Sequence, residues 1–521
     1  MDSSPDSIPA RSKSVTVTSD CRDLAVLAAG IFALIIVFHI ASALAGYPFF
    51  RDQHLGAALD YAKNGVKWLH PIIPGFNANG LGTPQEIPIW QALASLPLKA
   101  FGGWWGWANV VSLLIFSLSI PPVWMIAKSA LGERGAWWAV IAFLAQPLLI
   151  LVAGQASADG LAFVLALWAL YALLQMIQKQ DWRWFLAACI LGGLSATTKL
   201  PLFFCVGVSC GLHVLFTDFR SLRKWLLLAG AGAVSALLFF VWSKMTDEVL
   251  FAAEFPYTKL WLKDNPAMWN WYFGDWSYRL NPFNYMKAGW AALNCLLGSF
   301  ILVVALMTGF LTNARRLALP LLLGAVLTTL VFSHLVLVHR HYYVLYSLSI
   351  AILLGGSFCW LETHIRNCVP KWAAILLPWL MSAGILLSAI QGLIGIEVVL
   401  NFDPHPKEMA KIIQENVRPD EKILIQGGGW GGELLLRSER EGLSIWTDKA
   451  FKDPATLRRL KELGYSKLVM LSESPLLWAL KKTNPGSAAL DRESYRAEWS
   501  DRIDDWPNEV ITEDIVIKTI P

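Results

Sequence analysis

The sequence predicts an α-helical protein that crosses a membrane many times and ends in a small α/β domain. Of its 521 residues, 55% are hydrophobic and only 16% are charged, whereas soluble domains carry about 25% charged residues. Apolar stretches of about twenty residues, the length that spans a bilayer, recur between residues 24 and 400. Short strand and helix patterns alternate from residue 401 to 521, which is typical of an α/β unit.

The first 23 residues are polar, and we expect a disordered cytoplasmic N-terminus over residues 1–23. No small-residue cleavage site follows the first apolar stretch, Leu24–Leu44, so this stretch is interpreted as a retained span and not as a removed signal peptide. The seven cysteines lack metal-ligand spacing and none follows residue 400, so neither a disulfide framework nor a cysteine metal site is expected. No basic run interleaved with aromatic residues indicates nucleic acid as a partner.

The apolar stretches of the transmembrane domain, residues 24–400, predict about eleven spans. They lie near residues 24–46, 105–127, 135–153, 157–177, 184–199, 201–217, 225–244, 290–312, 317–338, 342–361 and 372–398. With this count, short turns bearing Arg134, Lys179, Arg220, Arg315 and Arg366 all fall on one side, which the positive-inside rule makes cytoplasmic.

The opposite face then receives the long segments, which are the external loop 47–104, the loop 244–289 and the tail 401–521. A transporter more often shows paired halves. This chain shows no internal repeat and elaborates one face only, which favours an enzyme working at the outer membrane surface.

The first external loop has its own structure. Residues 54–63 predict a short amphipathic helix, residues 68–82 are rich in Pro, Gly and Asn and predict irregular chain, and a second helix beginning at Glu86 is expected to lie in the interface. The aromatic residues of the loop 244–290 are suited to stacking on sugars and equally to anchoring at the interface.

The tail is expected to form strands and helices in alternation. Strands are predicted at residues 421–426, 443–446 and 467–471, with helices at 409–417, 432–441 and 453–463. The run Gly427–Gly432 matches G-x-G-x-x-G after a strand. Because the topology places the tail outside the cytoplasm, this run is interpreted as a glycine turn and not as a dinucleotide site.

Polar residues gather at four external positions that apolar spans would otherwise avoid. They are Asp52 with Gln53 and His54; Asp159; Lys199; and His339–Tyr343. Each has an ordinary explanation, since Asp159 can cap its helix while Lys199 and Arg340 can extend to the surface. Carboxylates and cations that face one compartment are also what sugar transfer from a lipid phosphate requires.

These motifs resemble, in order and spacing, the GT-C superfamily of polytopic glycosyltransferases that use polyprenyl-phosphate sugars. Protein O-mannosyltransferases and the aminoarabinose transferases of lipid A are the most similar in pattern. The resemblance covers roughly residues 24–400. Asp52-Gln53 stands where the family has an Asp-Glu pair, so Gln53 replaces the second acid. Pro88–Gln91 resembles a P-x-x-Q stretch, Thr198–Pro201 a T-K-x-P element, and His341–Tyr343 an H-x-Y-Y opening.

The resemblance implies an inverting, metal-independent sugar transferase whose donor is a polyprenyl-phosphate sugar; the sequence implies no particular cofactor and no divalent metal. Asp52 would be the catalytic base. The residues implied as donor and phosphate contacts are Lys199, Arg340, His341 and Tyr343, and the supporting residues are Gln53, His54, Glu86, Gln91 and Asp159. The expected location is a bacterial inner membrane with the site on its outer face. The sugar and the acceptor, whether lipid, glycan or protein, stay open.

Two other classes of function fit the same inventory. In a transporter or lipid-carrier flippase, Asp159, Lys199 and His341 would line a pathway, and the cavity would cross the midplane. A lipid phosphotransferase or polymerase-type ligase is the third possibility. A sugar transferase should instead bring Asp52, Asp159, Lys199 and Arg340 together at one external cavity.

Overall fold

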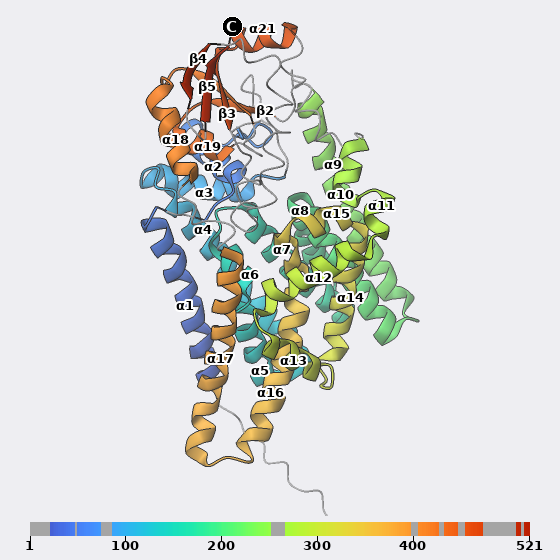
Figure 1. Cartoon of the computed structure of the whole chain (residues 1–521). Coiled ribbons are helices and arrows are strands. Elements are labelled where there is room, and N and C mark those ends of the chain that lie inside the picture. The colour runs from blue at the N-terminus through green and yellow to red at the C-terminus, as the bar shows by residue number, and fades with distance from the viewer. Residues whose placement is uncertain are drawn as a thin grey trace, which may run out of the picture.

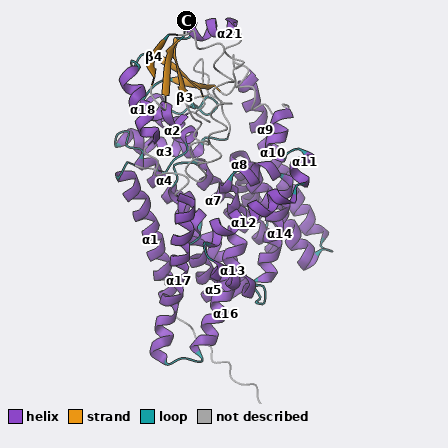
Figure 2. Ribbon diagram, viewed as in Figure 1, coloured by secondary structure: helices purple, strands orange, loops and turns teal. Residues whose placement is uncertain are grey.

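Helices dominate the chain, and a small β-sheet stands at one end of the helical bundle (Figures 1 and 2). The computed structural model describes residues 21–46, 49–73, 86–251, 266–397, 405–426, 432–445, 454–471, 507–511 and 515–520. The sheet, with α18 and α19, lies above α2 and α3, whereas the turn between α16 and α17 marks the opposite end (Figure 1).

The helices of the first 400 residues follow the apolar stretches closely. They are α1 (Arg22–Leu44), α2 (Asp52–Asn64), α3 (Ile89–Ala100), α4 (Gly106–Ser117), α5 (Ile120–Leu144), α6 (Pro147–Gly154), α7 (Ala158–Lys179), α8 (Trp182–Asp218), α9 (Leu222–Phe251), α10 (Pro266–Phe273), α11 (Trp276–Leu280), α12 (Pro282–Leu297), α13 (Phe300–Gly309), α14 (Arg315–Val331), α15 (Ser333–Val338), the 3-10 helix η2 (Arg340–Tyr346), α16 (Ser347–Arg366) and α17 (Lys371–Glu397). The polytopic helical class is therefore confirmed.

Seven helical segments within the described residues are long and apolar enough to cross a membrane. They are Arg22–Leu44, Gly106–Leu144, Ala158–Lys179, Leu200–Asp218, Leu222–Val249, Arg340–Arg366 and Lys371–Ile394. The pair α12 and α13, bent by 92° at its break, can supply an eighth. The expected count of about eleven is not confirmed, because several of the expected spans form short or broken helices.

One break lies inside α8, where the sequence predicts two spans that meet at Thr197–Pro201. The chain forms a single kinked helix whose Lys199 has non-helical dihedral angles (φ −150°, ψ 94°). Pro201 explains the break, since a proline inside a helix removes a backbone donor and disfavours helical geometry just before it. The kink interrupts the regular helical backbone at Lys199, and the Lys199 side chain can therefore contact residues from other elements.

The sheet of the C-terminal region has five strands in the order β2-β1-β3-β5-β4. The strands are β1 (Lys422–Gln426), β2 (Gly442–Ile445), β3 (Tyr465–Leu471), β4 (Asn508–Ile511) and β5 (Ile515–Thr519), and the helices are α18 (His405–Asn416), α19 (Gly432–Ser438) and α21 (Pro454–Glu462). β1 pairs in parallel with β2 and β3, and β5 is antiparallel to β3 and β4. The three predicted strands are confirmed, whereas β4 and β5 were not predicted. Residues 427–431 of the glycine turn lie outside the described residues.

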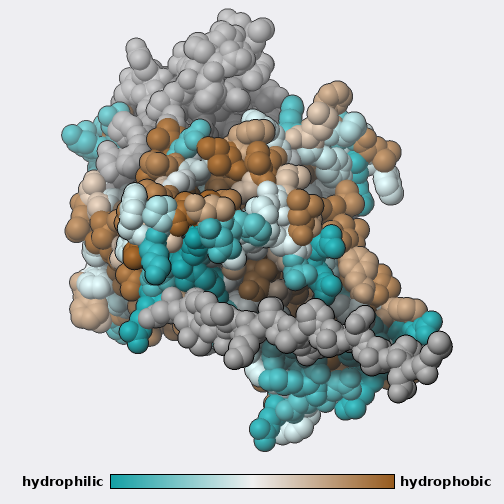
Figure 3. Space-filling model, turned by 90° about the horizontal axis from the view of Figure 1, so that it is seen from below, coloured by the Kyte–Doolittle hydropathy of each residue, from teal (hydrophilic) through white to brown (hydrophobic). Residues whose placement is uncertain are grey.

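The end of the bundle opposite the sheet carries the basic turns. Seen from this end, hydrophilic side chains gather across the face (Figure 3). Within it, Arg134 of α5 donates to the buried Glu362 of α16 at 2.8 Å and forms an ion pair with Asp23 of α1 at 3.0 Å. Trp138 also donates to Glu362, at 2.7 Å. This cluster ties three helices together at one level.

The Glu362→Ala variant should destabilise the protein by about 3 kcal/mol, because it leaves the Arg134 guanidinium without its buried counter-charge. Thermal unfolding of the detergent-solubilised protein measures the effect. Glu133→Ala is the matched control, since the Glu133–Lys128 pair is exposed and 3.8 Å apart and an exposed pair contributes about 0–1 kcal/mol. Equal losses in the two variants would contradict the role given to Glu362.

Candidate active site

A backbone contact fixes the start of α2 against the turn between α6 and α7. Phe50 and Ala156 form an isolated parallel bridge. The Arg51 N–H donates to the Ala156 carbonyl at 3.1 Å, and the Ala156 N–H donates to the Phe49 carbonyl at 2.8 Å. Residues 49–51 are therefore held beside the N-terminus of α7, about one hundred residues later in the chain.

Four charged side chains meet at this contact, and we call them the ion cluster: Arg51, Glu86, Asp159 and Lys199. Arg51 Nε lies 3.2 Å from Asp159 Oδ2, Lys199 Nζ lies 3.5 Å from Asp159 Oδ1, and Lys199 Nζ lies 2.9 Å from Glu86 Oε2. Both carboxylates are buried. Two cations and two carboxylates balance, which offsets the cost of removing each charge from water.

His54 extends the ion cluster beyond Glu86. Its Nδ1 accepts a hydrogen bond from the Ala158 N–H at 3.2 Å, and its Nε2 lies 2.5 Å from Glu86 Oε1. Because Nδ1 is an acceptor, the ring proton resides on Nε2 and is donated to Glu86. Burial alone would raise the pKa of Glu86, but Lys199 and His54 lower it to about 2. Glu86 is therefore a fixed anion that holds Lys199 in place.

His341 of η2 contacts the ion cluster from another direction. Its Nδ1 lies 3.0 Å from Arg51 Nη2, and since a guanidinium is only a donor, Nδ1 is the acceptor. Arg51 thus connects η2, through His341, with α7, through Asp159. Segments about 290 residues apart in the chain converge on one guanidinium.

Asp52 lies next to the ion cluster without taking part in its ion pairs. It is the first residue of α2 and is half-buried. Burial raises the pKa of Asp52, the backbone N–H of Gln53 lowers it, and the nearby Glu433 of α19 raises it; the net result is a pKa of about 6. A carboxyl group with a pKa close to neutrality is suited to accepting a proton in catalysis.

The C-terminal region reaches Asp52 through the first residue of α19. A Cβ atom added to Gly432 would lie 2.5 Å from Asp52 Oδ2, so only glycine allows this approach. Arg437 of the same helix stacks over Phe50 and Trp105 at 5.3 and 5.7 Å from the ring centroids, and it pairs with Glu433 at 2.7 Å. α19 therefore packs directly on the segment that carries the candidate base.

A cavity of about 570 Å³ opens beside these residues, within the usual size range for small-molecule sites. The polar part of its wall consists of Arg51, Asp52, Gln53, Glu86, Thr197, Thr198, Lys199, Thr246, Asp247, His339, His341 and Tyr342. The aromatic part consists of Phe239, Trp242, Trp269, Trp271, Tyr272, Phe273 and Phe332. Charged groups thus face aromatic rings across one space, which suits a ligand with both anionic and sugar-like parts.

Most of the residues predicted for the site lie at this cavity. Asp52, Gln53, Glu86, Lys199 and His341 line it. His54 and Asp159 lie behind its wall and hold the lining residues through the contacts above.

Three predicted residues lie elsewhere. Arg340 is exposed, Tyr343 is buried in the bundle core, and Gln91 is buried in α3; none of them lines the cavity. Arg51 supplies a second cation where Arg340 was expected to do so. The only feature of the sequence that could have indicated this role for Arg51 is its position directly before Asp52.

Tyr342 and Asp247 also line the cavity. Tyr342 lies within the polar position His339–Tyr343, but no role of its own was predicted for it. Asp247 lies near the C-terminal end of α9, and nothing in its local sequence distinguishes it from a surface residue. Among the described residues, no group of three His, Cys, Asp or Glu side chains has the arrangement of a metal site.

Known proteins share this architecture. Residues 86–243 match the family model described as dolichyl-phosphate-mannose-protein mannosyltransferase. The structure of ArnT from Cupriavidus metallidurans bound to undecaprenyl phosphate superimposes with a TM-score of 0.61 at 15% identity, covering 97% of this chain and 99% of ArnT. The apo form of ArnT gives the same TM-score and identity over 95% and 98% of the two chains.

A more distant similarity is found to the apo oligosaccharyltransferase of Archaeoglobus fulgidus, with a TM-score of 0.51 and 12% identity over 88% of this chain and 70% of that one. No curated protein sequence shows significant similarity to the chain. Because the sequence identities are this low, the structural matches show a shared fold and nothing more.

The Gly432→Ala variant tests the contact between α19 and Asp52. The added methyl group should displace the Asp52 carboxylate and lower the activity of the site, while the melting temperature changes little because a flexible side chain yields. Turnover and thermal unfolding of the purified protein measure the two effects. Gly207→Ala is the control, since its Cβ would meet no atom within 4 Å. Unchanged activity in Gly432→Ala would contradict the contact.

Proposed function

We propose that this chain, which has the GT-C glycosyltransferase fold, transfers a sugar from a polyprenyl-phosphate carrier to an acceptor on the outer face of the membrane. The observation that carries the proposal is the shared cavity wall of Asp52, Arg51 and Lys199. A base and two cations at one cavity meet the two charge requirements of this reaction, which are a proton to remove and a phosphate to stabilise.

In this mechanism Asp52 accepts the proton of the acceptor hydroxyl as that oxygen attacks the anomeric carbon of the donor sugar. The bond from that carbon to the phosphate oxygen breaks, and the lipid phosphate leaves with the bonding electrons. A single displacement of this kind inverts the anomeric configuration. The proton ends on Asp52, whose pKa of about 6 allows it to be released again at neutral pH.

Arg51 and Lys199 stabilise the negative charge that develops on the departing phosphate. Their ion pairs with Asp159 and Glu86 fix both cations before the substrate binds, so little reorganisation is needed in the transition state. The aromatic wall, with Trp242 and Trp269 among its members, provides surfaces on which sugar rings can stack. The donor class is supported further by the ligand of the matching ArnT structure, undecaprenyl phosphate.

The orientation that this proposal requires is a cytoplasmic N-terminus with residues 401–521 outside, in a bacterial inner membrane. The basic turns at the end opposite the sheet support it through the positive-inside rule. The alternative of a transporter or lipid-carrier flippase is less supported, because the charged groups of the cavity gather at one end of the bundle.

The assay that tests the function supplies purified protein with a panel of polyprenyl-phosphate sugars and, separately, with nucleotide sugars. We expect sugar transfer from the lipid-linked donor only, since the leaving group of the proposed reaction is a lipid phosphate. Transfer from a nucleotide sugar without a lipid carrier would overturn the proposal. The product identifies the sugar and the acceptor.

The Asp52→Asn variant should keep its fold and lose about two to four orders of magnitude in turnover, the usual contribution of a positioned general base. Asp60→Asn on the same helix is the control. Asp60 lies two turns further along α2 and accepts a hydrogen bond from Asn64, so its loss should change turnover little. Near-normal turnover in a well-folded Asp52→Asn protein would exclude Asp52 as the base.

The pH dependence of turnover should follow the raised pKa of Asp52. Only the ionised carboxylate accepts a proton, so kcat/KM should be flat above pH 6 and should fall tenfold per pH unit below it. Removing the negative charge of Glu433 lowers the pKa of Asp52, so Glu433→Gln should move the acid limb to lower pH. An acid limb that stays fixed in Glu433→Gln would assign the titration to a group other than Asp52.

A further inference from the structure

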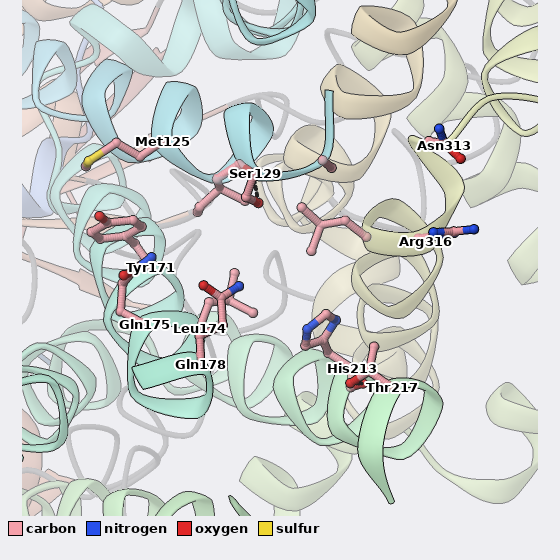
Figure 4. Close-up of a pocket in the computed structure, with 13 residues that line it drawn as sticks. Met125, Ser129, Tyr171, Leu174, Gln175, Gln178, His213, Thr217, Asn313 and Arg316 are labelled. Atoms are coloured by element: carbon pink, nitrogen blue, oxygen red, sulfur yellow. Dashed lines mark hydrogen bonds between the residues drawn. The ribbon is translucent and has the colours of Figure 1, made fainter. Parts of the chain in front are cut away.

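A second cavity, of about 300 Å³, lies near the Lys179 end of α7, whereas Asp159 of the candidate active site is at the other end of that helix. Figure 4 shows its walls, which come from α5, α7, α8, the first turn of α14 and the segment just before α14. None of its lining residues lines the first cavity. The second cavity is therefore a separate feature, and the proposed sugar transfer does not use it.

The second cavity lies at the depth of lipid head groups. Gln175 stands four residues before the end of α7 at Lys179, and His213 stands five residues before the end of α8 at Asp218. At a rise of 1.5 Å per residue, these side chains are about 6 to 8 Å inside the ends of their helices. Both helices are candidate spans, so this level corresponds to the boundary between hydrocarbon and head groups.

The polar lining of the cavity has donors and one positive charge but no carboxylate. Arg316 is the charged residue among the lining residues, and no ion pair of its guanidinium is found in the described part of the chain. Gln175, Gln178 and Asn313 add amide groups, and His213 has a buried Nδ1 without a hydrogen-bond partner in the described residues. This set of groups is suited to an anion that also accepts several hydrogen bonds.

We propose that the second cavity binds the phosphate head group of an anionic glycerophospholipid from the leaflet on the basic side of the membrane. Its volume lies at the lower end of the range for small-molecule sites, which fits a head group and leaves the acyl chains in the bilayer. Basic turns surround this end, and basic pockets between helices on the cytoplasmic side are suited to anionic lipid head groups.

Native mass spectrometry of the purified full chain, titrated with phosphatidylglycerol or with phosphatidylcholine, measures the binding. The wild-type protein should retain phosphatidylglycerol preferentially, and Arg316→Gln should weaken its binding about tenfold through loss of a charged hydrogen bond. Arg315→Gln is the matched control, since Arg315 is exposed, carries the same charge and does not line the cavity. If both variants weakened phosphatidylglycerol binding equally, the effect would come from the surface charge alone, and the proposal would be overturned.

A second variant tests the cavity without changing charge. Ala130→Phe places a ring in the cavity from α5 and should abolish the preference for phosphatidylglycerol, while sugar transfer at the opposite end continues. Retained preference in this variant would overturn the proposal.

A competition experiment with sn-glycerol 3-phosphate tests whether the cavity binds a soluble phosphate ester in place of the lipid head group. We expect sn-glycerol 3-phosphate to compete only weakly, and binding as tight as that of phosphatidylglycerol would assign the cavity to a soluble phosphate.

Discussion

The mutual neutralisation of Arg51, Glu86, Asp159 and Lys199 is the interaction on which the candidate site depends. Each of these charges is too costly to bury alone, and each has its counter-charge within 3.5 Å. The ion cluster joins residues from four separate segments of the chain. Removing one member would leave a charge uncompensated and would also release its neighbours from their positions at the cavity.

Two backbone features place these charges. The bridge between Phe50 and Ala156 brings the chain before α2 against the start of α7, and the break in α8 moves Lys199 out of the helical ladder. The proposed catalytic arrangement thus depends on an irregular segment inside an otherwise continuous helix. Such irregular backbone is tolerated at membrane depth where it is buried in protein or lines a cavity, and Lys199 lines one.

The two ends of the bundle use charge in different ways. At the end near the sheet, three members of the ion cluster, Arg51, Glu86 and Lys199, line a cavity, and Asp52 stays outside the ion pairs with a pKa near neutrality. At the opposite end, Arg134 and Glu362 form a largely buried pair that fastens helices together. The same residue types therefore serve catalysis at one end, as proposed, and stability at the other, and what separates the roles is access to a cavity.

The sequence by itself determined the helical membrane class, the three strands β1 to β3 and most residues of the candidate site. Twenty-residue apolar stretches and polar residues at their ends are local signals, so they can be read without knowledge of long-range contacts. Only the tertiary structure decided which polar residues meet. It places Arg51 at the cavity, Arg340 on the surface and Tyr343 in the core, although all three lie in polar stretches next to apolar segments of the sequence. The reason is geometric, because the direction in which a side chain points depends on helix rotation, on the kink at Lys199 and on packing between segments hundreds of residues apart.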